Sequence, residues 1–171
     1  MNSKIKFFII GLIFTTCLIT GVKATGNLSN VEAMFIYNFL RHVNWPEGNG
    51  GDKFVIGVYG NSDTYEQLVQ FTVNRKVGTK SIEVRKISSV TEATSCQLIF
   101  VPTESTSVIA KIKSQIGTGA CLIVGEREGS NSQGSTIEFV LKDNTLKFRI
   151  DEDRAREQNL LVSRALIDMS I

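Results

Sequence analysis

Hydrophobic residues recur in short runs along the chain, and each run ends at glycine, proline or a small polar residue. Four runs rich in β-branched and aromatic residues predict strands, at residues 53–59, 81–87, 97–101 and 120–124. Between them, apolar positions at helical spacing predict helices over 63–74 and 104–116. Apolar strands that alternate with helices are typical of a parallel sheet covered on both faces.

The pattern changes after the fourth strand. A polar, glycine-bearing loop over 127–134 precedes two further strands, 136–141 and 146–150, whose four-residue turn predicts an antiparallel hairpin. The tail from residue 151 is helical in pattern. Right-handed crossovers make 2-1-3-4 the simplest order for the first four strands, with the hairpin at the far edge. The sequence therefore predicts an α/β fold: a three-layer sandwich with a mostly parallel sheet and helices on both faces.

The segment 31–46, VEAMFIYNFLRHVNWP, predicts a helix that is apolar nearly all the way round. Asn30 would cap its first turn, and Trp45 before Pro46 would end it. One side is expected to pack on the sheet. The other side is either enclosed by the same chain or covers a partner, a second subunit or a ligand. The residues that we take as a candidate partner or dimer surface are Phe35, Tyr37, Phe39, His42 and Trp45.

The first 24 residues are typical of a secretory signal peptide. Lys4 and Lys6 precede an apolar run over 7–22, and the most favourable cleavage position follows Ala24. The run is short for a membrane-spanning helix, so retention as an anchor is the less favoured alternative. A single domain over 25–171 would then remain. It would carry 16 basic and 17 acidic residues, which gives no basic field for nucleic acid.

Two cysteines would remain after cleavage, Cys96 and Cys121, each at the head of a predicted strand. Export would permit a disulfide, but strands of one parallel sheet rarely hold two residues in the geometry that a disulfide needs. Two buried free thiols are therefore expected, with a Cys96–Cys121 disulfide as the alternative.

Few residues in the chain favour catalysis. His42 is the only histidine, the cysteine spacing matches no zinc pattern, and no nucleophile elbow, phosphate loop or dinucleotide fingerprint occurs. Glu126 and Glu128 flank Arg127 and could act as paired carboxylates, but polar loops of this kind are ordinarily only solvated. No catalytic residue, metal or cofactor is assigned from the sequence.

A ligand of such a sheet is expected beyond the carboxyl ends of the strands, where the strand order reverses. Here that point lies between the turns that follow the first and third strands, with the loop after the fourth strand beside them. Asn61 and Ser62 either cap the following helix or help its N-terminus to hold an anion. The candidate ligand-binding residues are Gly60, Asn61, Ser62, Thr103, Glu104, Glu126 and Arg127.

Five segments in this order resemble the YfiR-type periplasmic proteins: AMFIYNFLRHVNWP, FVIGVYGNSD, CQLIFV, GSTIEFVLKDNTLKFRID and NLLVSRALIDM. The resemblance covers residues 31–169. Asn159 stands where that family usually has glycine, and the loop 125–131 lacks the family's phenylalanine. Of the two cysteines, only Cys96 falls at a familiar family position, so redox control is not carried over.

The resemblance implies an exported, non-enzymatic regulator that restrains biofilm formation by binding the periplasmic domain of a membrane diguanylate cyclase and so lowering cyclic diguanylate. It also implies a homodimer and a response to small molecules. A sensor kinase is the other partner class considered. The alternative function is a periplasmic protein that binds a small solute, an anion, at the strand ends. A hydrolase using Glu126 ranks last.

Overall fold

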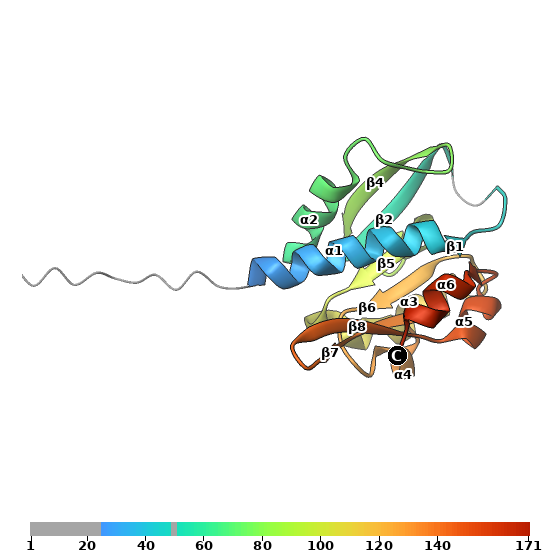
Figure 1. Cartoon of the computed structure of the whole chain (residues 1–171). Coiled ribbons are helices and arrows are strands. Elements are labelled where there is room, and N and C mark those ends of the chain that lie inside the picture. Colours follow the sequence, from blue (N-terminus) through green and yellow to red (C-terminus); the bar gives the residue numbers. More distant parts are fainter. Residues whose placement is uncertain (1–24, 49–50) are drawn as a thin grey trace, which may run out of the picture.

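The computed structural model describes residues 25–48 and 51–171. In this part of the chain one seven-stranded sheet runs in the order β3-β4-β2-β5-β6-β7-β8, and a separate two-stranded ladder joins β1 and β9 (Figure 1). The strands are β1 (Val43–Asn44), β2 (Lys53–Tyr59), β3 (Lys76–Val77), β4 (Lys80–Ile87), β5 (Leu98–Val101), β6 (Leu122–Gly125), β7 (Ile137–Lys142), β8 (Thr145–Ile150) and β9 (Leu161–Val162). The helices are α1 (Thr25–His42), α2 (Asp63–Thr72), α3 (Ile109–Ile116), α4 (Ser130–Gln133), α5 (Glu152–Glu157) and α6 (Arg164–Met169), with 3₁₀ turns η1 (Glu92–Ser95) and η2 (Thr103–Val108).

The predicted sheet order is confirmed. The strands β4, β2, β5, β6 and β7 are parallel neighbours, and β7 and β8 form the expected antiparallel hairpin. The hairpin turn holds Asp143 and Asn144 at positive φ, a conformation that these two residue types tolerate best after glycine. The two-residue strand β3, which the pattern did not predict, pairs with the outer side of β4.

Alternate residues of the strands enter two separate cores, which is why their sequences are apolar throughout. On one face, Phe54, Ile56 and Val58 of β2 pack with α1 and the C-terminal segment. On the other face, Val55 of β2 packs with Ile109 of α3. Helices therefore cover both faces of the sheet, as predicted (Figure 1).

The helix α1 lies across the sheet but differs in its limits from the expected helix. It is already helical from Thr25, so Asn30 is inside the helix and does not cap it. It ends at His42, because Val43 and Asn44 leave the helix to pair with Val162 and Leu161 of β9. Trp45 therefore lies beyond the helix end, where its indole Nε1 donates a hydrogen bond to the carbonyl oxygen of Gln97 at 3.0 Å.

Other helix limits also differ in detail. The predicted helix 104–116 is two elements, because residues 103–108 form a 3₁₀ turn before α3 begins at Ile109. The helix α2 begins at Asp63 with Ser62 as its N-cap and ends at Thr72, two residues earlier than expected. Asn159 adopts positive φ two residues after the end of α5, as predicted for a left-handed stop. Ser163 caps α6, also as predicted.

Cys96 and Cys121 are free and buried, in agreement with the expected state. Both belong to the core on the α3 face of the sheet. Burial raises the pKa of both thiols, which keeps them protonated and poorly nucleophilic.

The predicted signal peptide, residues 1–24, lies outside the described residues. Among the residues that are described, no helix has the length and apolar character needed to cross a membrane.

Candidate functional site

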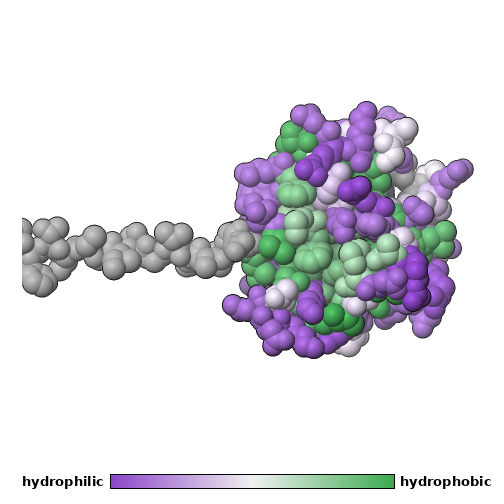
Figure 2. Space-filling view, viewed as in Figure 1, coloured by the Kyte–Doolittle hydropathy of each residue, from purple (hydrophilic) through white to green (hydrophobic). Residues whose placement is uncertain are grey.

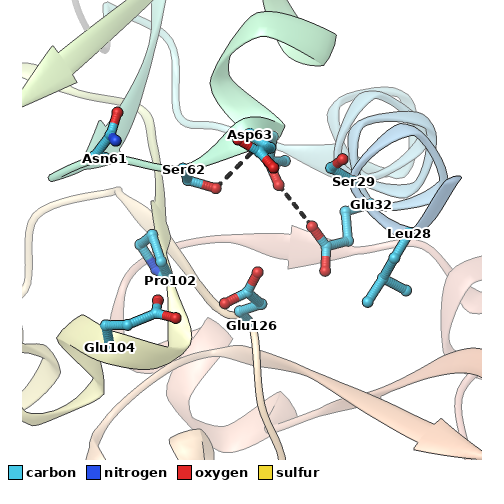
Figure 3. A pocket seen from close by; sticks show the side chains of 10 residues that line it. Leu28, Ser29, Glu32, Asn61, Ser62, Asp63, Pro102, Glu104 and Glu126 are labelled. Carbon is cyan, nitrogen blue, oxygen red and sulfur yellow. Dashed lines mark hydrogen bonds between the residues drawn. The ribbon is translucent and has the colours of Figure 1, made fainter. Parts of the chain in front are cut away.

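A crevice of about 300 Å³ opens where β2, β5 and β6 end, beside the N-terminal half of α1 (Figure 3). This is the place that the strand order predicts for a ligand. Its lining residues are Leu28, Ser29, Glu32, Asn61, Ser62, Asp63, Thr64, Pro102, Glu104 and Glu126.

The chain turns at three strand ends to build this crevice. Gly60 follows β2 with a φ of 69°, which permits the turn into the N-terminus of α2. There the hydroxyl oxygen of Ser62 accepts a hydrogen bond from the backbone N–H of Thr64 at 3.2 Å. After β6, the carboxylate of Glu126 accepts a hydrogen bond from the backbone N–H of Thr103, at the start of η2. This bond ties the loop after β6 to the loop after β5.

Four of the seven residues predicted to bind a ligand line the crevice: Asn61, Ser62, Glu104 and Glu126. The other three lie beside it. Gly60 shapes the turn, Thr103 contributes its backbone N–H to Glu126, and Arg127 is exposed outside the lining.

Glu32 is a lining residue that the sequence analysis did not assign to the site. Only 2 % of its surface is exposed, and its Oε2 accepts a hydrogen bond from the Thr64 hydroxyl at 2.6 Å. Burial raises the pKa of Glu32 to about 7, and the like charge of Glu126 across the crevice adds to this effect. In the sequence, Glu32 is a carboxylate among apolar helix positions. With Asn30 as the N-cap, Glu32 would be an ordinary acid in the first helical turn.

The charge of the crevice does not favour an anion. The lining contains Glu32, Asp63, Glu104 and Glu126 but no lysine, arginine or histidine. The N-terminus of α2 does reach the crevice, yet Asp63 at its first position already places a carboxylate there. Within residues 25–48 and 51–171, no group of acidic, histidine or cysteine side chains is arranged to hold a metal ion.

The second candidate region, α1, presents a partly exposed apolar face. Val31, Met34, Phe35 and Asn38 lie along its outer side, while Ala33, Ile36 and Leu40 are buried against the sheet. Met34 is 48 % exposed, and Leu28, six residues earlier, is 40 % exposed. Figure 2 shows apolar surface crossing the middle of this face of the molecule, with polar side chains around it.

The residues that the sequence suggested for this surface are mostly engaged inside the chain. Phe39 is fully buried, so its placement on a partner surface is wrong; its ring packs in a cluster with those of Phe139 and Phe148. Phe35 is half-buried at the edge of the same cluster. Tyr37 is half-buried against Phe71, and the guanidinium of Arg75 lies 4.5 Å from the centre of the Tyr37 ring.

His42 and Trp45 connect α1 to other parts of the chain. The Nδ1 of His42 lies 3.1 Å from the hydroxyl oxygen of Ser163, in hydrogen-bonding contact, and its backbone carbonyl accepts a hydrogen bond from the Ser163 N–H at 2.8 Å. The Trp45 ring packs edge-on against Phe54, with ring centres 4.8 Å apart. Both side chains therefore hold the C-terminal segment and the sheet against the end of α1.

Comparison with known families decides the identity. The model of the family described as YfiR/HmsC-like (DUF4154) matches residues 29–170, which is nearly all of the described chain. The chain belongs to the YfiR/HmsC-like family. Comparison with curated proteins gives no match. At the level of the YfiR/HmsC-like family, the role is that of a periplasmic regulator of diguanylate cyclases and not that of an enzyme. The match includes residues 29–42 of α1, all three strand ends of the crevice and the C-terminal segment that pairs with β1.

Proposed function

We propose that this protein is an exported, non-enzymatic repressor that binds the periplasmic domain of a membrane diguanylate cyclase. In this proposal the signal peptide is cleaved near Ala24, and residues 25–171 act as one domain in the periplasm. Binding lowers the output of the cyclase and so restrains biofilm formation. The family supports the class of partner, and a sensor kinase with a similar periplasmic domain is the alternative partner.

The observation that carries this proposal is the exposed apolar face of α1. Clustered apolar surface on a folded protein commonly marks a protein interaction site. Met34 and Leu28 expose 48 % and 40 % of their surface although apolar α1 residues on the opposite side are almost completely buried. A second copy of the chain could use the same face, so homodimerisation is included in the proposal.

The test changes the charge of this face. Met34→Glu places a carboxylate at the exposed centre of the outer side of α1 and should leave the core intact. We expect it to weaken binding to the isolated cyclase domain at least tenfold, which corresponds to about 1.4 kcal/mol. Calorimetric titration with the periplasmic domain of a cyclase encoded beside the gene measures this, and sedimentation of the protein alone measures dimer formation.

Ala110→Glu is the matched control, because Ala110 is exposed on α3, on the opposite side of the sheet. It adds the same charge at a distance from α1 and should leave binding unchanged. Equal binding by Met34→Glu, Ala110→Glu and the unmodified protein would show that the outer face of α1 is not the partner surface.

A further inference from the structure

The crevice has the dimensions and the lining of a site for a small solute. Its volume of about 300 Å³ is at the lower end of the range found for small-molecule pockets. Leu28 and Pro102 supply apolar contact, and Ser62 is also part of the lining. The carboxylates come from α1, the start of α2, the start of η2 and the end of β6, so the folding of the whole sheet edge brings them together (Figure 3).

A second observation concerns the charge of Glu32. Two glutamates are buried among the described residues, Glu32 and Glu138, with exposed fractions of 2 % and 4 %. Glu138 is compensated: one oxygen accepts from Arg149 at 3.1 Å and the other from the backbone N–H of Asn131 at 2.9 Å. Glu32 accepts from the neutral hydroxyl of Thr64 through Oε2, and none of the ion pairs among the described residues includes it.

The other three crevice carboxylates also lack a cationic partner in the described part of the chain. None of the ion pairs found within the described residues includes Asp63, Glu104 or Glu126, although ten such pairs join other acids to lysine or arginine. A buried carboxylate without a cationic partner is costly, and a ligand cation removes that cost. Figure 3 shows the carboxylates of Glu32 and Glu126 directed toward the same space.

We propose that this crevice binds a small organic cation with a primary ammonium group, held between Glu32 and Glu126. An ammonium is a compact charge with three hydrogen-bond donors, which suits carboxylates that approach from different elements. The more exposed Asp63 and Glu104 add negative potential at the rim, and Leu28 and Pro102 contact the apolar part of the ligand. The proposal stands whether or not the protein represses a cyclase.

The titration of Glu32 supports the proposal. Its pKa of about 7 means that Glu32 is mostly ionised at about pH 8 and mostly neutral at about pH 5.5. The other titratable groups that line the crevice are Glu126, Asp63 and Glu104, all acidic, and of these the charge of Glu126 acts on Glu32. If the ammonium requires ionised Glu32, its affinity should fall about 30-fold between these two pH values.

The experiment uses n-butylamine as the probe and the exported protein, with amide shifts followed by nuclear magnetic resonance. Butanol and butyrate of the same chain length are the neutral and anionic analogues. We expect butylamine to give saturable shifts at residues 61–64, 103–104 and 126, and both analogues to give none at the same concentration. Glu126→Gln should weaken butylamine about tenfold, because it removes one charged hydrogen-bond acceptor.

Glu47→Gln is the matched control, since Glu47 is exposed and lies outside the crevice lining. It lowers the negative charge of the protein by the same amount and should leave the affinity unchanged. Failure of butylamine to bind at about pH 8, stronger binding of butyrate, or equal weakening by the two variants would each overturn the proposal. Binding of a cyclase through the face of α1 around Met34 is measured separately.

Discussion

Replacing Glu32 with glutamine is expected to raise the free energy of unfolding by up to about 3 kcal/mol at about pH 8. Glu32 has its pKa raised from 4.5 to about 7 in the folded protein, mainly by burial. Between these values the folded state holds a proton that the unfolded state has lost. The stability of the unmodified protein therefore falls as pH rises from 4.5 to about 7, and the loss is complete above that range.

Glutamine has nearly the same shape and carries an oxygen that can still accept from the Thr64 hydroxyl, but it does not ionise. The variant should therefore lack this pH-dependent loss and match the unmodified protein at about pH 4. Urea unfolding of both proteins over a series of pH values measures the difference, with Glu47→Gln as an exposed control. A constant difference at every pH would contradict the assignment of Glu32 as a buried, titrating group.

Gly125→Ala is expected to lower the free energy of unfolding by about 3 kcal/mol, near the upper end of the usual cost of overpacking. A Cβ on Gly125, at the end of β6, would overlap the Cβ and Oγ of Ser130. Ser130 is fully buried, and its carbonyl accepts from the backbone N–H groups of Gly134 and Ser135, so it has little freedom to move away. Urea unfolding at one pH measures the change.

Two further variants test the cause of that loss. Gly51→Ala adds the same methyl group in open space, because no atom lies within 4 Å of a Cβ built there, and should change stability little. Ser130→Gly in the Gly125→Ala protein removes the overlapping atoms and should recover part of the stability. If the double variant is no more stable than Gly125→Ala alone, the clash with Ser130 is not the reason for the loss.

The strands and their order could be predicted from the sequence because each is a short apolar run with a clear end. In β5, for example, Leu98 to Val101 are all buried and Pro102 ends the strand. The crossover rule then allowed few sheet orders, and the observed order is the simplest of them. The hairpin followed from the turn between Leu141 and Leu146.

The parts that could not be predicted depend on contacts between distant segments. The end of α1 is set by pairing of Val43 with Val162, which lie far apart in the sequence. The bonds from His42 to Ser163 and from Trp45 to Gln97 likewise turn two candidate surface residues, His42 and Trp45, into structural ones. Phe39 resembles its neighbours on α1 in the sequence, and only the position of the Phe139–Phe148 cluster shows that it is buried.

The candidate crevice, too, could be predicted only in part. Its location follows from strand order, so Asn61, Ser62, Glu104 and Glu126 could be named from the sequence. Its charge could not, because Glu32 comes from α1, about thirty residues before Asn61, and reaches the crevice only through the packing of α1 on α2. The sequence therefore suggested an anion where the structure gathers carboxylates.

The most direct test of the proposed function is the cellular concentration of cyclic diguanylate in a strain that lacks the gene. We expect the concentration to rise, to return to normal when the unmodified protein or Ala110→Glu is supplied, and to stay high with Met34→Glu at equal protein level. An unchanged concentration after deletion of the gene, under conditions in which the protein is present in the periplasm, would contradict the proposal that it represses a cyclase.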